Sequence, residues 1–506
     1  MPIVHLLPDD FSPRSAFRKL ARLPGCLWLD SASPGPLSGS EGTSEREPLG
    51  RYSFLTADPV AMIVAEVGDP DPWPELRHWA KRLPTTALPG LPPFQGGMAG
   101  LWGYEAASWL ESTGPLAEAD LPTAAVRVGA YDWVIAHDGL SGRSWLISHG
   151  YRGPDWVGDM HRAAARREQV LGWLDADPTP GEPESRRDLS PTGPQPTSAP
   201  TPPAGCSRDR VGHTSNRTEP AMACYPTDRP GVLSNFTSAG LRAAIAEIID
   251  GIRQGDTFQV NLAQRLIHPF SGSPAELYLR LRETNPAPLG GYLNGGDFQV
   301  LSSSPEGFLR FRDGQVETRP IKGTTPRTGD PAVDRDLAKV LSASDKERAE
   351  NVMIVDLMRN DLSPVCEDDS VEVTQLCRVE SYAFVQHLVS VVRGKLVAGV
   401  TPIDALAACF PGGSVTGAPK IEAMRTIARL EPNRRGPYCG SLGYASAGGA
   451  AEFNILIRTV TVADGWCQVP VGGGITAGSD PASEERETWV KAEGMLRATR
   501  AGIIPT

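Results

Sequence analysis

The chain has 506 residues, of which 22% are charged and 40% hydrophobic, and its formal net charge is −11. A chain of this length exceeds the usual size of one domain, so we expect two domains or one large two-lobed domain. The acidic balance argues against nucleic-acid binding, which requires a basic surface. The sequence contains no apolar run of about 18 residues, so we expect no membrane-spanning helix.

The first ten residues lack the basic start and apolar stretch of a signal peptide. Eight cysteines are scattered along the chain without a CxxC pair, which is too sparse for a disulfide scaffold. We therefore expect a cytoplasmic protein. The eight histidines show neither HxxH nor HxxxH spacing, so structural zinc is not expected.

The N-terminal part, residues 1–174, predicts a structural lobe without a catalytic cluster. Residues 175–230 are rich in Pro, Thr, Ser and Gly, and such a composition buries too little apolar surface to offset its ordering entropy. We therefore expect a disordered linker there and a catalytic domain over 231–506. Short apolar strands are predicted in the N-terminal lobe at 61–67, 125–128, 133–136 and 144–148.

The C-terminal part alternates predicted helices and strands. Apolar residues at 241, 244, 245 and 248 follow the helical period, which predicts a helix over 240–253. Further helices are predicted at 274–284, 332–341, 346–358, 417–430 and 482–500. Strands are predicted at 257–267, 298–301, 308–311, 315–319, 439–444, 453–462 and 466–471.

Lys322 lies in residues 317–327 (ETRPIKGTTPR), where a strand-like run ends and Gly323 permits a turn. Enzymes often place reacting groups at such strand ends, and a lysine held there can lose solvation and attack carbon. The alternative is a solvated loop lysine, which is the commoner fate of Lys. Glu306 follows an apolar strand 16 residues earlier. A hairpin of that length lets Glu306 and Lys322 face one cavity as acid and nucleophile.

Paired carboxylates occur on two predicted helices. Glu484 and Glu487 are three residues apart and Lys491 is four further on, so all three project from one helix face. Glu350 and the glutamate three residues before it repeat this spacing. Carboxylates from two helices form an all-oxygen site suited to Mg²⁺. The alternative, which the spacing alone favours, is surface charge pairing with neighbours such as Lys346.

Two glycine-rich segments follow predicted strands. Residues 471–479 (VGGGITAGS) contain Gly472, Gly473 and Gly474, whose backbone N–H groups can approach a carboxylate or phosphate closely. The segment lacks both the GxxxxGK[ST] and the GxGxxG pattern, so no nucleotide is implied. Residues 410–420 (FPGGSVTGAPK) place the Thr416 hydroxyl before a predicted helix, where a helix N-cap is the alternative to a functional role.

Six strings together resemble the chorismate-utilising enzymes, which include component I of anthranilate synthase and of aminodeoxychorismate synthase, and the isochorismate and salicylate synthases. The resemblance is dense over about 235–502 and weak before that. It implies an α+β fold with a large, two-lobed, β-sandwich-like core of antiparallel sheets flanked by helices. The strings are 317–327, 348–362 (RAENVMIVDLMRNDL), 411–420, 436–444 (GPYCGSLGY), 453–459 (FNILIRT) and 472–491.

Two positions sort the reactions of this family. Members that add water to chorismate carry a lysine base where this chain has Gln259, and an amide has no useful basicity. Anthranilate synthases usually have alanine where this chain has Lys322, and a lysine there resembles aminodeoxychorismate synthase. The resemblance therefore implies that chorismate and ammonia give 4-amino-4-deoxychorismate for para-aminobenzoate and folate synthesis. It implies that Lys322 attacks C2 as the 4-hydroxyl leaves, and that ammonia then enters at C4 and expels the lysine.

The resemblance also implies a role for each matching residue. Lys322 corresponds to the nucleophile and Glu306 to the general acid. The Mg²⁺ ligands correspond to Glu350, Glu484 and Glu487, with the ion bridging to the C1 carboxylate of chorismate. For His387 the alternative is a packed histidine on a strand. The implied substrate-binding residues are Gly323, Thr324, His387, Thr416, Tyr438, Arg458, Gly472, Gly473, Gly474 and Lys491.

Two further partners follow from the resemblance. Release of ammonia from glutamine needs a nucleophilic cysteine on a glycine-rich elbow, and Cys26 and Cys439 match that setting poorly. We therefore expect a separate glutamine amidotransferase subunit. Relatives also hold tryptophan in an N-terminal pocket, where it is inhibitory or merely structural, and the sequence leaves open whether this chain binds it. By position the pocket residues here are Ser31, Tyr52, Ser53 and Pro286.

Two alternatives to aminodeoxychorismate synthase component I stay open. Anthranilate synthase component I shares every motif except the lysine at 322. A non-catalytic binding paralogue is the second alternative. The presence of all the implied nucleophile, acid and metal-binding residues argues against the paralogue.

Overall fold

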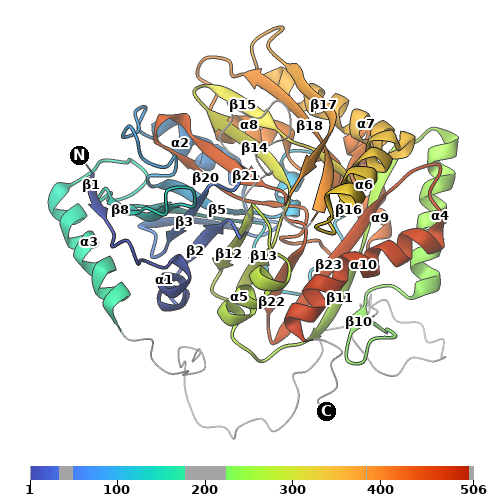
Figure 1. Ribbon diagram of the computed structural model, residues 1–506, viewed down its shortest axis with the longest axis horizontal. Coiled ribbons are helices and arrows are strands. Elements are labelled where there is room, and N and C mark those ends of the chain that lie inside the picture. Colours follow the sequence, from blue (N-terminus) through green and yellow to red (C-terminus); the bar gives the residue numbers. More distant parts are fainter. Residues whose placement is uncertain (1, 33–48, 177–223, 383–384, 501–506) are drawn as a thin grey trace, which may run out of the picture.

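A computed structural model describes residues 2–32, 49–176, 224–382 and 385–500 (Figure 1). Most of the predicted linker lies outside these described residues. Two antiparallel sheets form the centre of the molecule, and helices cover them. This confirms the α+β architecture implied by the family resemblance. None of the helices in the described ranges combines the length and apolar character that crossing a membrane requires.

The larger sheet contains thirteen strands within the described residues, and both halves of the chain contribute to it. From the first half come β1 (Ile3–Leu6), β2 (Leu27–Asp30), β3 (Tyr52–Thr56), β7 (Trp133–Asp138) and β8 (Ser144–Ser148). From the second half come β9 (Tyr225–Pro226), β10 (Leu233–Ser234), β11 (Gln259–Pro269), β12 (Gly290–Asn294), β13 (Phe298–Ser302), β19 (Gly417–Ala418), β22 (Thr459–Ala463) and β23 (Trp466–Ile475). The order is β1-β8-β7-β3-β2-β12-β13-β22-β23-β11-β10-β9, and β19 pairs with β11.

The second sheet has ten strands in the described part of the chain, again from both halves. Its strands are β4 (Ala61–Ala65), β5 (Gly97–Trp102), β6 (Val126–Tyr131), β14 (Gly307–Arg312), β15 (Gln315–Thr318), β16 (Ile321–Pro326), β17 (Glu372–Ser381), β18 (Val385–Lys395), β20 (Ser441–Ser446) and β21 (Ala451–Asn454). The order is β16-β18-β15-β14-β21-β20-β5-β6-β4, and β17 pairs with β18.

The two sheets share a packed aromatic core. Phe54 of the larger sheet lies 5.3 Å from Tyr444 of the second sheet, measured between ring centroids, and Phe94 packs against both rings. All three side chains are buried. Aromatic rings bury large apolar areas, so this cluster joins the sheets into one body.

The helices begin where the sequence supplies caps. Helix α4, for example, starts after Thr237, whose hydroxyl accepts from the Gly240 N–H, and ends at Gly255 in the left-handed region. The helices are α1 (Pro13–Leu20), α2 (Trp73–Arg82), α3 (Met160–Asp175), α4 (Ser238–Gln254), α5 (Pro274–Thr284), α6 (Pro331–Ala343), α7 (Asp345–Leu362), α8 (Pro402–Cys409), α9 (Lys420–Leu430) and α10 (Pro481–Thr499).

Three predicted elements need correction. The helix predicted over 417–430 begins only at Lys420, because Pro419 disfavours helical backbone at the residue before it, and Gly417–Ala418 forms β19 instead. The strand predicted over 453–462 is two strands, β21 and β22, that belong to different sheets. Lys322, predicted at a turn after a strand, lies within β16.

Candidate active site

The residues predicted for catalysis, metal binding and substrate binding come from several strands, helices and connecting segments on one side of the molecule. Strand β16 packs against α6 and α7, and α10 packs along β23. Other predicted residues come from β18, from the segment between β13 and β14, and from the crossing between β21 and β22. Thr416 lies just before β19, and Tyr438 lies between α9 and β20. Figure 1 shows α6, α7 and α10 gathered beside β16 and β23.

Glu306 is a buried carboxyl group held by its backbone. Its N–H donates to the Ser304 hydroxyl at 3.2 Å, and its carbonyl accepts from the Ile455 N–H at 3.0 Å. Burial raises the pKa of Glu306 to about 7, against the opposing effects of a hydrogen bond from Ser414 and the charge of Lys322. A carboxyl group with such a pKa carries a transferable proton at neutral pH.

Lys322 lies at an irregularity of β16. Lys322 pairs with Leu388 and Thr324 pairs with His387, and the register shifts between them at Gly323. Gly323 has φ +71°, and a Cβ there would lie 2.7 Å from Leu341 Cδ1 and 2.9 Å from a carboxylate oxygen of Glu347. The position therefore requires glycine for two separate reasons.

The positive charge of Lys322 acts on three carboxylates. It favours the ionised forms of Glu306, Glu350 and Glu487, which opposes burial in each case. These glutamates come from three separate parts of the chain, so the fold brings all three within electrostatic range of Lys322. The electrostatic effect of Lys322 on Glu306 is consistent with the prediction that the two side chains face one cavity.

The acidic side chains of α7 and α10 differ in their environments. Burial raises the pKa of Glu350, and the positive charges of Lys322 and Lys346 oppose that rise. Burial also acts on Glu487, but Lys491 Nζ lies 2.7 Å away and holds its pKa below the usual value. Glu484 accepts a hydrogen bond from the Ser479 hydroxyl at 2.7 Å.

The carboxylates are not gathered into a ready-made metal site. Within the described residues no group of three or more His, Cys, Asp or Glu side chains is close enough to hold a metal ion. Instead, Lys346 Nζ lies 3.9 Å from Glu350 Oε1 and 4.0 Å from Glu484 Oε1. Glu350 Oε1 is buried and has no hydrogen-bond partner in the described part of the chain. The donor chemistry fits Mg²⁺, and a lysine ammonium lies between two of the donors.

Thr324 and His387 form a hydrogen-bonded pair across β16 and β18, with 2.9 Å between the hydroxyl and Nδ1. Burial and, to a smaller extent, the charge of Arg458 lower the pKa of His387 to about 4. The imidazole is therefore neutral at pH 7. His387 is therefore a packed histidine on β18, and its role in binding substrate stays a prediction.

Arg458 lies at the crossing between the two sheets. Its backbone has φ +51°, and its Nη1 donates to the Lys491 carbonyl at 3.5 Å. Burial lowers the pKa of Arg458, and the nearby Tyr438 and Glu487 oppose that effect. Tyr438 is buried, and burial raises the pKa of its hydroxyl. Arg458 is partly buried, and among the described residues its guanidinium has only the Nη1 hydrogen bond, so its other donors are suited to a carboxylate ligand.

The glycines of β23 keep space open for α10. Gly472 lies opposite Ala263 of β11, and the Lys491 ammonium donates to the Gly472 carbonyl at 2.9 Å. A Cβ at Gly473 would lie 3.3 Å from Glu484 Oε2 and 3.6 Å from Lys491 Nζ. Larger residues here would push against the charged groups of α10.

Thr416 ties its loop to β11. Its hydroxyl donates to the Gly412 carbonyl at 3.0 Å, and its own carbonyl accepts from the Asn261 N–H at 2.7 Å. The N-cap alternative is wrong, because Pro419 caps α9 without a side-chain hydrogen bond. The hydroxyl of Thr416 therefore stabilises the loop that precedes β19.

Three residues near the site have surroundings that the sequence does not predict. Ser414 bonds Glu306, and Ser479 bonds Glu484. Both serines lie in glycine-rich segments of the sequence, but nothing in the spacing of those segments predicts a hydrogen-bond partner. Gln259 is fully buried beside Gly474, and neither atom of its amide has a hydrogen-bond partner in the described residues.

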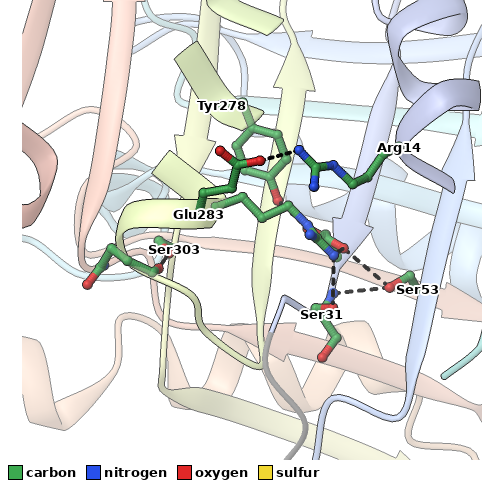
Figure 2. A network of polar contacts seen from close by, with 9 residues as sticks. Arg14, Ser31, Ser53, Tyr278, Glu283 and Ser303 are labelled. Carbon is green, nitrogen blue, oxygen red and sulfur yellow. Dashed lines mark hydrogen bonds and ion pairs between the residues drawn. The ribbon is translucent and has the colours of Figure 1, made fainter. Parts of the chain in front are cut away.

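The predicted tryptophan pocket contains a polar network (Figure 2). The Ser31 N–H donates to the Ser53 hydroxyl at 3.1 Å, and that hydroxyl donates to Asp30 at 3.4 Å. Asp30 also accepts from Arg282 Nε at 2.5 Å and from the Tyr278 hydroxyl at 3.1 Å. The carboxylate of Asp30 thus ties β2 and β3 to α5.

The other two residues predicted for this pocket lie differently. Tyr52 precedes Ser53 on β3, so its side chain points to the opposite face, where its ring lies 6.1 Å from Phe54. The segment containing Pro286 lies beside Ser31, because the Ala32 N–H donates to the Ala287 carbonyl at 3.0 Å. The structure therefore places Ser31 and Ser53 together and Tyr52 apart from them.

Comparison with known proteins gives a consistent result. Residues 207–497 match the family described as chorismate binding enzyme. The chain is 38% identical over 501 residues to anthranilate synthase component 1 of Streptomyces coelicolor, covering 98% of this chain and 88% of that protein. It is 34% identical over 468 residues to aminodeoxychorismate synthase component 1 of Salmonella typhimurium, covering 89% of this chain and 90% of the relative. Its fold resembles anthranilate synthase component I of Streptococcus pneumoniae, with a TM-score of 0.71, 30% identity, and coverage of 91% and 95%.

Proposed function

The chain belongs to the family of chorismate-binding enzymes, and we propose that within this family it acts as component I of an aminodeoxychorismate synthase. In that reaction chorismate and ammonia give 4-amino-4-deoxychorismate and water, and the pyruvyl ether is kept. The observation that carries the proposal is the lysine at 322, whose charge acts on both Glu306 and Glu350.

The first step uses Lys322 and Glu306. The unprotonated amine of Lys322 attacks C2 of chorismate, and the bond between C4 and the hydroxyl oxygen breaks. Both conjugated ring double bonds shift, from C1=C2 and C5=C6 to C1=C6 and C4=C5. Glu306 gives its proton to the departing hydroxyl, which leaves as water. The pKa of Glu306, raised by burial to about 7, supports this role because the proton is present at neutral pH.

The second step reverses the shift. Ammonia forms a bond to C4, both ring double bonds return to C1=C2 and C5=C6, and the bond between C2 and the Lys322 nitrogen breaks. Lys322 leaves as the free amine, the product carries an ammonium group, and Glu306 regains a proton from solvent. Two displacements thus place nitrogen at C4 without direct attack on the carbon that bears the hydroxyl.

The remaining residues bind and orient the substrate in this proposal. The guanidinium of Arg458 binds the pyruvyl carboxylate through two parallel hydrogen bonds. Lys491 adds positive charge beside the glycines of β23, and Thr324 offers a hydroxyl oriented by neutral His387. Mg²⁺, when held by Glu350, Glu484 and Glu487, would supply positive charge to the C1 carboxylate of chorismate.

Anthranilate synthase component I is the second candidate. The 38% identity to the Streptomyces coelicolor protein favours it. Both candidates use ammonia, and we propose that a separate glutamine amidotransferase subunit supplies it. We also propose tryptophan as the ligand class of the region around Ser31 and Ser53, supported by their shared hydrogen bond.

Incubation of the purified chain with chorismate, ammonium and Mg²⁺ tests the function, with the product identified by mass. We expect aminodeoxychorismate from the wild type and from a Lys339→Ala control, since Lys339 is an exposed lysine of α6 paired with Asp336. Lys322→Ala should lower its formation by at least about a hundredfold, since the variant lacks the nucleophile. Anthranilate from the wild type, or an unchanged kcat in Lys322→Ala, would overturn the proposal.

A further inference from the structure

Lys346 has an unusual position between two acidic helices. It belongs to the first turn of α7, one turn before Glu350, and Glu484 reaches it from α10. Its ammonium lies 3.9 Å from Glu350 Oε1 and 4.0 Å from Glu484 Oε1. One positive charge therefore lies between carboxylates of two separate helices.

The two carboxylates need this charge. Their side chains are only 13% and 8% exposed, and the charge of Glu484 contributes to raising the pKa of Glu350. Two buried like charges repel each other, and a cation between them offsets the repulsion. In the described structure the lysine ammonium supplies that cation.

The lysine is held loosely. Both of its distances exceed hydrogen-bond length, and its side chain is 56% exposed. Lys491 is the contrasting case, because its ammonium is fixed by Glu487 at 2.7 Å and by the Gly472 carbonyl at 2.9 Å. The flexible stem of Lys346 can therefore carry its ammonium into solvent at small cost.

We propose that Lys346 is a displaceable internal counter-ion. Its ammonium neutralises Glu350 and Glu484 until a divalent cation takes its place between them. The inference rests on the proposed function only in taking these two glutamates as metal ligands. It explains why the carboxylates stay together without a metal, and it makes metal affinity depend on a residue that is not itself a ligand.

Metal binding without substrate tests the inference. Mn²⁺ serves as the probe, and free Mn²⁺ is measured by electron paramagnetic resonance during titration of the wild type, Lys346→Gln and Lys339→Gln. We expect Lys346→Gln to bind Mn²⁺ roughly fivefold more tightly, since a competing charge of a half-exposed lysine is removed. Lys339→Gln is the matched control, because it removes an exposed lysine that pairs away from the site.

Two further measurements separate the outcomes. Lys346→Arg keeps the charge and should bind Mn²⁺ no more tightly than the wild type. Without metal, Lys346→Gln should unfold at a lower temperature than the wild type, and saturating Mn²⁺ should close that gap. Equal or weaker Mn²⁺ binding by Lys346→Gln overturns the inference alone. Absence of Mn²⁺ binding in the wild type overturns it together with the proposed metal ligands.

Discussion

Burial of Glu306 lowers the stability of the fold when the carboxyl group ionises, and the same burial keeps a proton available for catalysis. The carboxyl group is buried, and its pKa is raised from 4.5 to about 7. Between these two values the folded chain binds more protons than the unfolded chain, so the free energy of unfolding falls as the pH rises through this window. The loss is complete above about pH 7. A shift of this size corresponds to about 3 kcal/mol for the deprotonated group.

Glu306→Gln should therefore change how stability depends on pH. An amide does not titrate, so the variant should gain about 2–3 kcal/mol relative to the wild type between pH 5 and pH 8. Chemical denaturation at the two pH values measures this difference. Glu422→Gln, which alters an exposed carboxylate of α9, is the control. Parallel pH profiles for Glu306→Gln and the wild type would show that Glu306 ionises normally in the folded chain.

Strand β16 depends on one glycine for its shape. Gly323 and Gly329 both have positive φ, at +71° and +84°, but only Gly323 is crowded by neighbouring side chains. Gly323→Ala should be less stable than Gly329→Ala by about 1–3 kcal/mol, because it adds a clash to the same backbone strain. It should also reduce activity, since Lys322 and Thr324 flank the position. Thermal unfolding and turnover of both variants measure these effects, and equal stability would contradict the crowding.

Local sequence patterns predicted several elements well. The helix predicted over 274–284 has the same bounds as α5, because its apolar period, its Ser273 cap and its first-turn proline are all local features. The carboxylate spacing likewise placed Glu484 and Glu487 on α10. Features of this kind need no information about distant parts of the chain.

Other features depend on contacts far apart in the sequence. The apolar run that contains Arg458 gives no sign that the chain changes sheets there, because each sheet supplies its own pairing partners. Helix spacing predicts only that Lys346 pairs with acidic neighbours along α7. It gives no information about Glu484, which lies on α10. Pairing across elements therefore decides both the shape of the site and its charge balance.

At the scale of the whole molecule, the N-terminal half contacts the segment that precedes Tyr438 in the candidate site. Glu105 accepts from the N–H groups of Arg435 and Gly436 at 2.7 and 3.0 Å, and the Arg435 guanidinium lies 4.6 Å above the Tyr104 ring. These contacts are buried and lie next in sequence to Tyr438. Stability of the first half and geometry of the site are therefore coupled.

The cysteines bear on the source of ammonia. Burial raises the pKa of five of them, so their thiols stay protonated at neutral pH and are poor nucleophiles. Among them are Cys26 and Cys439, the two that come nearest in sequence to an amidotransferase setting. The five are Cys26, Cys366, Cys409, Cys439 and Cys467.

We therefore expect the purified chain to be inactive with glutamine alone and active with ammonium. The rate at fixed total ammonium should rise with pH, because ammonium must lose a proton before it attacks C4. When rates are instead compared at equal free ammonia, they should fall above about pH 7 as Glu306 loses its proton. Addition of a glutamine amidotransferase subunit should restore turnover with glutamine, measured as aminodeoxychorismate formed. Sustained glutamine-dependent turnover by the single purified chain would refute the need for a second subunit.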